Sequence, residues 1–142
     1  MSADGFFASS DADLLRSVID DLRLDPDLQG VLGTPARIFD DETQGAAYPY
    51  VVLERHECLP ADASEVCGAE HRLGFASYSR FGGRREAREI LGALRTAIER
   101  VQPTLSGQRI VLAHVTYSDA MRTRDRRSFR GVLRARVITE QV

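Results

Sequence analysis

Residues 78–88 read YSRFGGRREAR and mark a change from strand to helix. Residues 70–77, just before them, predict a strand. After them, apolar side chains recur every three or four positions over residues 84–101, which is typical of an amphipathic helix packed on a core. The Gly82–Gly83 pair supplies the sharp reversal between the two, because glycine adopts backbone conformations closed to other residues. Pro103 cannot continue a helix, so we expect the helix to end before it.

The N-terminal part of the sequence predicts an arm followed by two helices. Residues 1–10 are expected to form a loose arm, separate from a domain that spans residues 11–142. Apolar positions at helical spacing predict a first helix from about residue 11 to residue 24. A second, short helix is expected to begin at Pro26, since proline suits the first helical position, and to end at Gly33.

Strands account for most of the remaining sequence. They are predicted at residues 37–39, 48–57, 108–117 and 129–139. In the last of these, Leu133 alternates with Arg130 and Arg134, so one face is expected in the core and the other at the surface. Residues 58–69 form a long connection, and residues 118–128 form a polar, basic one. One central helix among strands predicts a single α+β domain, whose mostly antiparallel sheet carries the N-terminal and central helices on one face.

Charge is distributed unevenly along the 142 residues. Residues 1–70 hold 15 Asp and Glu and 4 Arg, a net of −11, whereas residues 71–142 hold 6 Asp and Glu and 15 Arg, a net of +9. Such halves can neutralise each other within one fold, or can form opposite faces for head-to-tail association. No apolar run approaches the roughly 20 residues of a membrane span, so no membrane partner is predicted. The N-terminus does not resemble a secretory signal.

Two histidines and two cysteines have a spacing that could suit a metal. His56, Cys58, Cys67 and His71 form the pattern H-x-C-x8-C-x3-H, which offers two nitrogen and two sulfur ligands to zinc. This spacing departs from the usual finger patterns, which contain a C-x2-C pair. The favoured alternative is therefore two reduced cysteines at the ends of a loop, and no metal or other cofactor is predicted.

Arginine is densest near the C-terminus, and this region has three possible roles. The side chains could bind nucleic-acid phosphates, contact another protein, or simply be solvated. A protein interface is favoured, since arginine is enriched at interfaces and few aromatic residues are available for stacking on bases. No nucleophile motif or pair of catalytic carboxylates is evident, so the protein is predicted not to be an enzyme.

Several short motifs occur together in an order that resembles a known family. Residues 48–52 read YPYVV, residues 78–87 read YSRFGGRREA, and residues 105–110 read LSGQRI before an arginine-rich final strand. In this order the sequence resembles the DUF3168 family, the tail-completion or tail-terminator proteins of long-tailed phages and of gene transfer agents. The resemblance covers roughly residues 11–140.

This resemblance implies a structural protein that assembles with copies of itself. Members of the family form a ring, expected to be a hexamer, that caps the tail tube, ends its polymerisation and joins the tail to the neck. The implied partners are therefore further copies of the chain, the tail tube protein and a head-tail stopper or neck protein, with DNA passing through without sequence-specific binding. The implied location is the tail-neck junction of a particle assembled in the bacterial cytoplasm. The family has no catalytic residues to carry over.

The residues expected at contacts with other subunits or with the tube come from two regions. They are Leu59, Asp62, Glu65, Val66, Arg122, Arg124, Arg126, Arg127, Arg130, Arg134 and Arg136. Many of these arginines are expected to pair with acids across the seam between subunits. The alternative function is a small nucleic-acid-binding α+β domain that uses the same C-terminal arginines.

Overall fold

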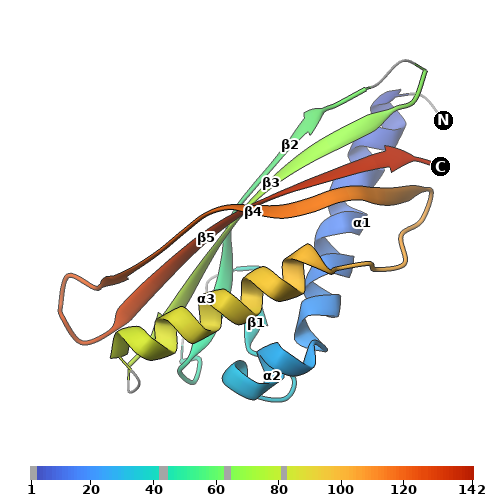
Figure 1. Cartoon of the computed structure of the whole chain (residues 1–142). Coiled ribbons are helices and arrows are strands. Elements are labelled where there is room, and N and C mark those ends of the chain that lie inside the picture. Colours follow the sequence, from blue (N-terminus) through green and yellow to red (C-terminus); the bar gives the residue numbers. More distant parts are fainter. Residues whose placement is uncertain (1–2, 42–44, 63–64, 81–82) are drawn as a thin grey trace.

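Five strands form one twisted sheet, and the helices lie against one of its faces (Figure 1). The computed structural model describes residues 3–41, 45–62, 65–80 and 83–142. In chain order the elements are α1 (Ala3–Arg23), α2 (Pro26–Leu32), β1 (Ile38–Phe39), β2 (Tyr50–Pro60), β3 (Gly68–Ser79), α3 (Gly83–Glu99), β4 (Gln108–Arg122) and β5 (Phe129–Gln141). The predicted α+β class, with a largely antiparallel sheet, is confirmed.

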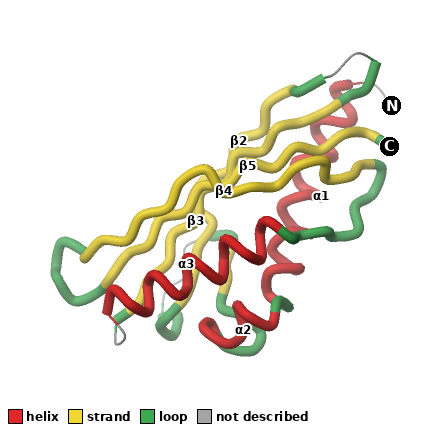
Figure 2. Tube along the Cα trace, viewed as in Figure 1, coloured by secondary structure: helices red, strands yellow, loops and turns green. Residues whose placement is uncertain are grey.

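The strand order in the sheet is β1-β2-β3-β5-β4. Every neighbouring pair is antiparallel except β1 and β2, which are parallel over two residue pairs. The helix α3 connects β3 to β4, and β5 then returns to lie between them. The sheet therefore has β4 at one edge, while most of β2 forms the opposite edge beyond the two-residue β1 (Figure 2).

The helix α3 forms where the sequence predicts it and packs on β3, β4 and β5. Its first residue, Gly83, has φ 62°, a conformation that glycine adopts without strain. Gly82 lies outside the described residues. One face of the helix is buried, through Ala87, Ile90, Leu91, Leu94, Ala97 and Ile98. These side chains meet Leu133, Ala135 and Val137 of β5 in the core, so the alternation predicted for the last strand is confirmed.

The first helix begins earlier than predicted. It starts at Ala3 instead of near residue 11, so most of the segment expected as a loose arm is helical. The polar residues that suggested a helix start at Ser10 can also lie inside a helix. The helix can therefore extend toward the N-terminus, because each residue added to a formed helix contributes one more backbone hydrogen bond. By contrast, α2 is as predicted: the Asp25 carboxylate accepts hydrogen bonds from the backbone N–H groups of Asp27 and Leu28.

The strands are longer than their side chains suggested, and the expected long connections are correspondingly short. The β2–β3 loop comprises residues 61–67 instead of 58–69, and the β4–β5 turn comprises residues 123–128 instead of 118–128. Polar residues at the ends of these strands remain paired because ladder hydrogen bonds join backbone groups whatever the side chain. The two connections lie at opposite ends of the sheet, since Gly68 pairs with Glu140 and Ser79 pairs with Phe129.

Candidate interaction surfaces

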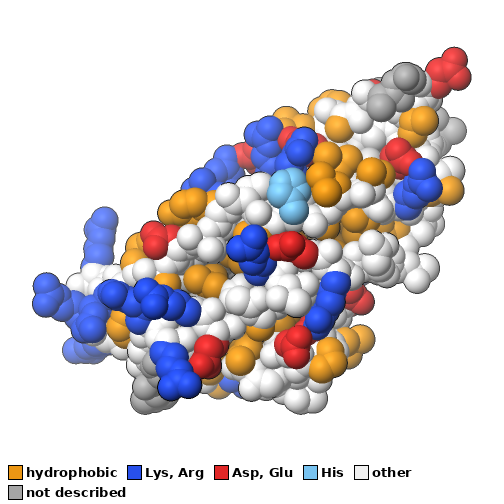
Figure 3. All heavy atoms as spheres, viewed as in Figure 1, with side chains coloured by type: hydrophobic (Ala, Val, Ile, Leu, Met, Phe, Trp, Pro, Cys, Tyr) orange, Lys and Arg blue, Asp and Glu red, His pale blue; other side chains and the backbone are white. Residues whose placement is uncertain are grey.

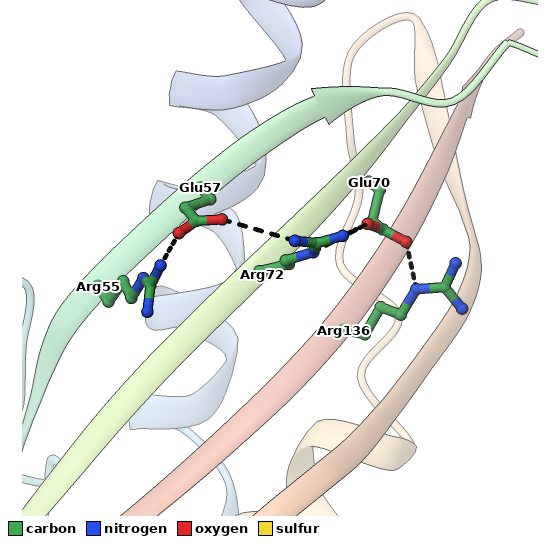
Figure 4. A network of polar contacts seen from close by, with 5 residues as sticks. All are labelled: Arg55, Glu57, Glu70, Arg72 and Arg136. Atoms are coloured by element: carbon green, nitrogen blue, oxygen red, sulfur yellow. Dashed lines mark hydrogen bonds and ion pairs between the residues drawn. The ribbon is translucent and has the colours of Figure 1, made fainter.

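The sheet face that the helices leave uncovered carries a chain of ion pairs. It runs from Arg55 through Glu57, Arg72 and Glu70 to Arg136, across β2, β3 and β5 (Figure 4). Residues opposite each other in neighbouring strands project to the same face, which brings these side chains together. A hydrogen bond from Arg136 holds the pKa of Glu70 below its ordinary value, with a further contribution from Arg72. The carboxylate therefore stays ionised between two guanidinium groups.

A second polar cluster lies on the same face, nearer the β4–β5 turn. Arg130 Nη2 lies 2.5 Å from Glu54 Oε2, and the Tyr78 hydroxyl donates to Glu54 Oε1 at 3.0 Å. Burial raises the pKa of Tyr78, so its hydroxyl keeps its proton. Arg134 is placed differently, with its guanidinium carbon 5.3 Å from the centre of the Tyr117 ring. Such a cation–π contact is weak at an exposed position.

Between these clusters the open face is hollowed. Two adjoining depressions, of about 260 and 280 Å³, share Arg55, Gly74 and Arg134 in their walls. A Cβ atom on Gly74 would lie 3.1 Å from Arg55 Cβ. The missing side chain therefore helps to leave this part of the sheet open. The walls combine arginine and glutamate side chains with apolar ones such as Met121 and Val132, so the open face offers a mixed contact surface.

The ion pairs also show what becomes of the opposite charges in the two halves of the sequence. Arg130 and Arg136, from the basic half, pair with Glu54 and Glu70 from the acidic half. Arg100 likewise lies 2.7 Å from Asp25. Part of the asymmetry is therefore neutralised within one chain. The role predicted for Arg130, Arg134 and Arg136 between subunits stays a prediction.

The remaining arginines of the predicted site gather at one end of the molecule. Arg122 is the last residue of β4, and Arg124, Arg126 and Arg127 lie in the turn that follows. The turn is held by Asp125, whose carboxylate accepts from the Thr123 hydroxyl at 2.5 Å. This hydrogen bond, with another from the Arg127 backbone, lowers the pKa of Asp125. We call this end, with residues 122–127, the basic tip; arginine side chains cluster at this end in Figure 3.

The other predicted contact residues lie at the opposite end, around the β2–β3 loop. Leu59 belongs to β2 and pairs with Glu70, contrary to its predicted place in a loop. Asp62 accepts a hydrogen bond of 3.0 Å from the Gly68 N–H and so fixes the loop. Glu65 and Val66 are exposed. The structure therefore separates the predicted residues into two ends and an open face, instead of bringing them together as one site.

Of the four residues weighed as zinc ligands, the two histidines come together, and neither Cys58 nor Cys67 belongs to their cluster. His56 Nε2 lies 3.1 Å from His71 Nδ1, and the third group at this point is the Asp11 carboxylate from α1. Burial raises the pKa of Cys58 to about 11, and the charge of Asp11 adds to this effect. Asp11 was missed because it precedes His56 by 45 positions, and no sequence pattern connects them.

No helix in the described part of the chain is long and apolar enough to cross a membrane.

The uncovered β4 edge carries the main exposed apolar side chains of the sheet. Val111 is 55% exposed, and Leu112, Tyr117 and Met121 are also exposed. An edge strand with free backbone groups and apolar side chains is a template for pairing with another chain.

A mostly antiparallel α+β subunit with an uncovered long edge offers a surface on which another chain can pair. A model of the family described as tail completion protein gp17 matches residues 16–140, and the chain belongs to that family. It is therefore a structural protein of a phage-type tail. The match confirms the tail-completion part of the resemblance, while the DUF3168 name stays a prediction.

Comparison with solved structures supports the same fold. A protein chain in a structure described as the virion of a native gene transfer agent (GTA) particle has a TM-score of 0.80 and 24% sequence identity. The alignment covers 94% of this chain and 98% of that chain, so the whole architecture is shared. No curated protein sequence matches the chain.

Proposed function

We propose that the protein is a tail terminator, which forms a closed ring, expected to be a hexamer, on the last ring of the tail tube. In this role it ends polymerisation of the tube and joins the tail to the head-neck connector. The observation that carries the proposal is the family match over residues 16–140. The ring, the capping role and the position at the tail-neck junction go beyond that match and rest on the surfaces described above.

Ring closure needs two different surfaces on each subunit that fit one another. The β4 edge is one candidate, because its backbone groups are unpaired on the outer side and its apolar side chains are exposed. The opposite edge, residues 53–60 of β2, is the second, since β1 covers only Val51 and Val52. The sheet can thus meet one neighbour at each side. The ring closes when the rotation from one subunit to the next is a whole-number fraction of a full turn.

The two ends of the subunit suit contacts with the tube and the neck. The basic tip and the β2–β3 loop lie at opposite ends of the strands, so in a ring with strands near the axis direction they project above and below its plane. The tip carries Arg122, Arg124, Arg126 and Arg127, whereas the loop carries Asp62, Glu65 and Val66. Different partners of opposite charge can therefore bind the two ends.

The open face of the sheet suits the passage of DNA. Its arginines contact phosphate without reading sequence, because sequence is read at base edges. Arg130 and Arg136 are paired with Glu54 and Glu70, so the face is mixed in charge instead of strongly positive. A lumen lined by this face would therefore hold DNA weakly and let it move.

The ring is tested by measuring the mass of purified protein with light scattering and by imaging it with negative stain. We expect a discrete closed species, and we expect Val111→Glu to yield monomers because it places a charge in the β4 edge contact. Leu24→Glu is the matched control: Leu24 is 70% exposed and lies between α1 and α2, outside the strands of the sheet. A wild-type protein that stays monomeric at high concentration, and whose copies do not touch in particles, would refute the ring.

Capping is tested in particles that lack the protein. Tails of uncontrolled length, or tails detached from heads, are the expected result. Tails of normal length joined to heads would contradict the proposed role, even if the purified protein forms rings.

The basic tip favours one alternative, a domain that binds nucleic acid. Phosphate contacts by Arg122, Arg124, Arg126 and Arg127 would make affinity fall steeply with salt. A fluorescence titration with duplex DNA at about 50 and 200 mM salt separates the two functions, since several phosphate contacts cost orders of magnitude in affinity over this range. Weak binding at both concentrations, together with a discrete ring, supports the terminator.

A further inference from the structure

Three potential metal ligands from separate elements converge where α1 meets the inner face of the sheet. Asp11 belongs to α1, His56 to β2 and His71 to β3. One ligand atom from each lies within 4.8 Å of the other two. His56 Nε2 is central, at 3.0 Å from Asp11 Oδ1 and 3.1 Å from His71 Nδ1.

The protonation of these groups does not explain their arrangement well. A single hydrogen on His56 Nε2 can serve one of its two close neighbours, Asp11 or His71, and leaves the other contact without a proton between two electronegative atoms. Asp11 Oδ1 is buried and, despite its short distance from His56, makes no hydrogen bond of acceptable geometry among the described residues. A cation at the centre would satisfy all three atoms at once.

We propose that Asp11, His56 and His71 bind one zinc ion, or a similar first-row divalent metal, which fastens α1 to β2 and β3. Zinc is held by histidine nitrogen and carboxylate oxygen at about 2.0–2.2 Å in tetrahedral geometry, which places its ligand atoms about 3.3 Å from one another. Two of the three separations, at 3.0 and 3.1 Å, need only a small expansion to reach that value, and the third is no more than 4.8 Å. Three protein ligands leave the fourth position to water.

A metal ion at this site would link α1 to β2 and β3, the two strands that lead to the β2–β3 loop. Asp11 lies in the first half of α1 (Ala3–Arg23), and this helix contacts the sheet mainly at β1 and β3. A bound ion would hold this part of the helix against the strands that lead to the loop. The proposal concerns a single chain and does not depend on the terminator function.

The test is a zinc titration of the full-length wild-type chain after treatment with EDTA and dialysis, followed by calorimetry and by metal analysis. We expect one zinc per chain and a higher thermal midpoint with zinc than with EDTA, because a ligand that binds the folded state stabilises it. The variants His56→Asn and Asp11→Asn should bind zinc about 100-fold more weakly or worse, since even outer-shell changes cost about 10–100-fold. These side chains are partly exposed, so the variants are less disruptive than a change at the fully buried His71.

The third histidine of the chain provides the control. His114 lies opposite Arg136 in β4, on the other face of the sheet. His114→Asn should therefore bind zinc within about twofold of the wild type. Less than a tenth of an equivalent of zinc on the wild type, equal binding by His56→Asn, or loss of binding in His114→Asn would each overturn the proposal. Thermal midpoints in EDTA show whether each variant is folded before zinc is added.

Discussion

Gly131 is the place where a single methyl group should disturb the packing of α3 on the sheet. It lies on the inner face of β5, opposite Ser77 of β3. A Cβ at this position would be 3.0 Å from Leu91 Cδ2 and 3.2 Å from Leu91 Cγ, and still closer to Ser77 Oγ. Leu91 belongs to the buried face of α3, so it has little room to withdraw. We therefore predict that Gly131→Ala destabilises the fold.

The magnitude follows from two opposing effects. Overpacking a well-packed core costs about 1–3 kcal/mol. Replacing glycine by alanine also restricts the unfolded chain, which returns about 0.4–1 kcal/mol. The net expected loss in the free energy of unfolding is about 1–2 kcal/mol. For a chain of this size that corresponds to a fall in the thermal midpoint of about 3–8 °C.

The assay is urea unfolding followed by circular dichroism, with Ser77→Ala as the matched variant. Among the described residues, Ser77 Oγ is buried and has no hydrogen-bond partner. Removing it should leave stability unchanged or raise it by up to about 1 kcal/mol, because a buried unsatisfied hydroxyl is costly. The double variant should recover most of the loss caused by Gly131→Ala, with a coupling energy of about 1 kcal/mol or more.

Two results would refute this reasoning. One is a loss below about 0.5 kcal/mol in Gly131→Ala, which would mean that Ser77 and Leu91 adjust freely. The other is strict additivity in the double variant, which would mean that Ser77 is not the obstacle. The slope of the unfolding free energy against urea concentration must be the same in all variants, because a changed slope would mean that more than native stability has changed.

Three further predictions concern α3, α2 and the open face. Leu94→Ala removes a fully buried side chain of α3 and should cost about 2–5 kcal/mol in urea unfolding. Asp25→Ala removes the cap of α2 and its ion pair with Arg100, and should cost about 1–2 kcal/mol, whereas Asp25→Asn, which can still cap, should cost less. Glu70, whose pKa is lowered mainly by Arg136, stabilises the fold when ionised. That contribution is complete above the unfolded pKa of about 4.5 and is lost as the pH falls through the lower folded pKa. The free energy of unfolding should therefore fall less in Glu70→Gln than in the wild type between pH 7 and pH 3.

Local sequence signals predicted some elements well. The apolar spacing of α3 and the glycines before it are properties of adjacent residues, and so is the Asp25–Pro26 start of α2. The alternation in β5 likewise identified which side chains enter the core. Each of these elements has a signal that is complete within about 15 residues, so no knowledge of distant partners is needed.

Predictions made from one segment at a time were wrong where neighbouring strands decide how far an element extends. The ends of β2 and β4 look polar, yet they continue as strands because β3 and β5 supply the opposite backbone groups. The start of α1 was misplaced for a related reason, since a capping pattern at Ser10 does not exclude a longer helix. The extra strand residues shorten both loops and move Leu59 from a loop into the sheet.

The sequence by itself determined the α+β class, the central helix with its buried face, and the motif order by which the chain resembles tail completion proteins. It did so because periodicity, turn residues and short motifs are encoded by neighbours in the chain. Tertiary structure alone decided that Glu70 lies between Arg72 and Arg136, and that Asp11 meets His56 and His71. Apart from Arg72, which is two positions from Glu70, the partners are far apart in sequence, so these contacts exist only once the strands have paired and α1 has packed against them.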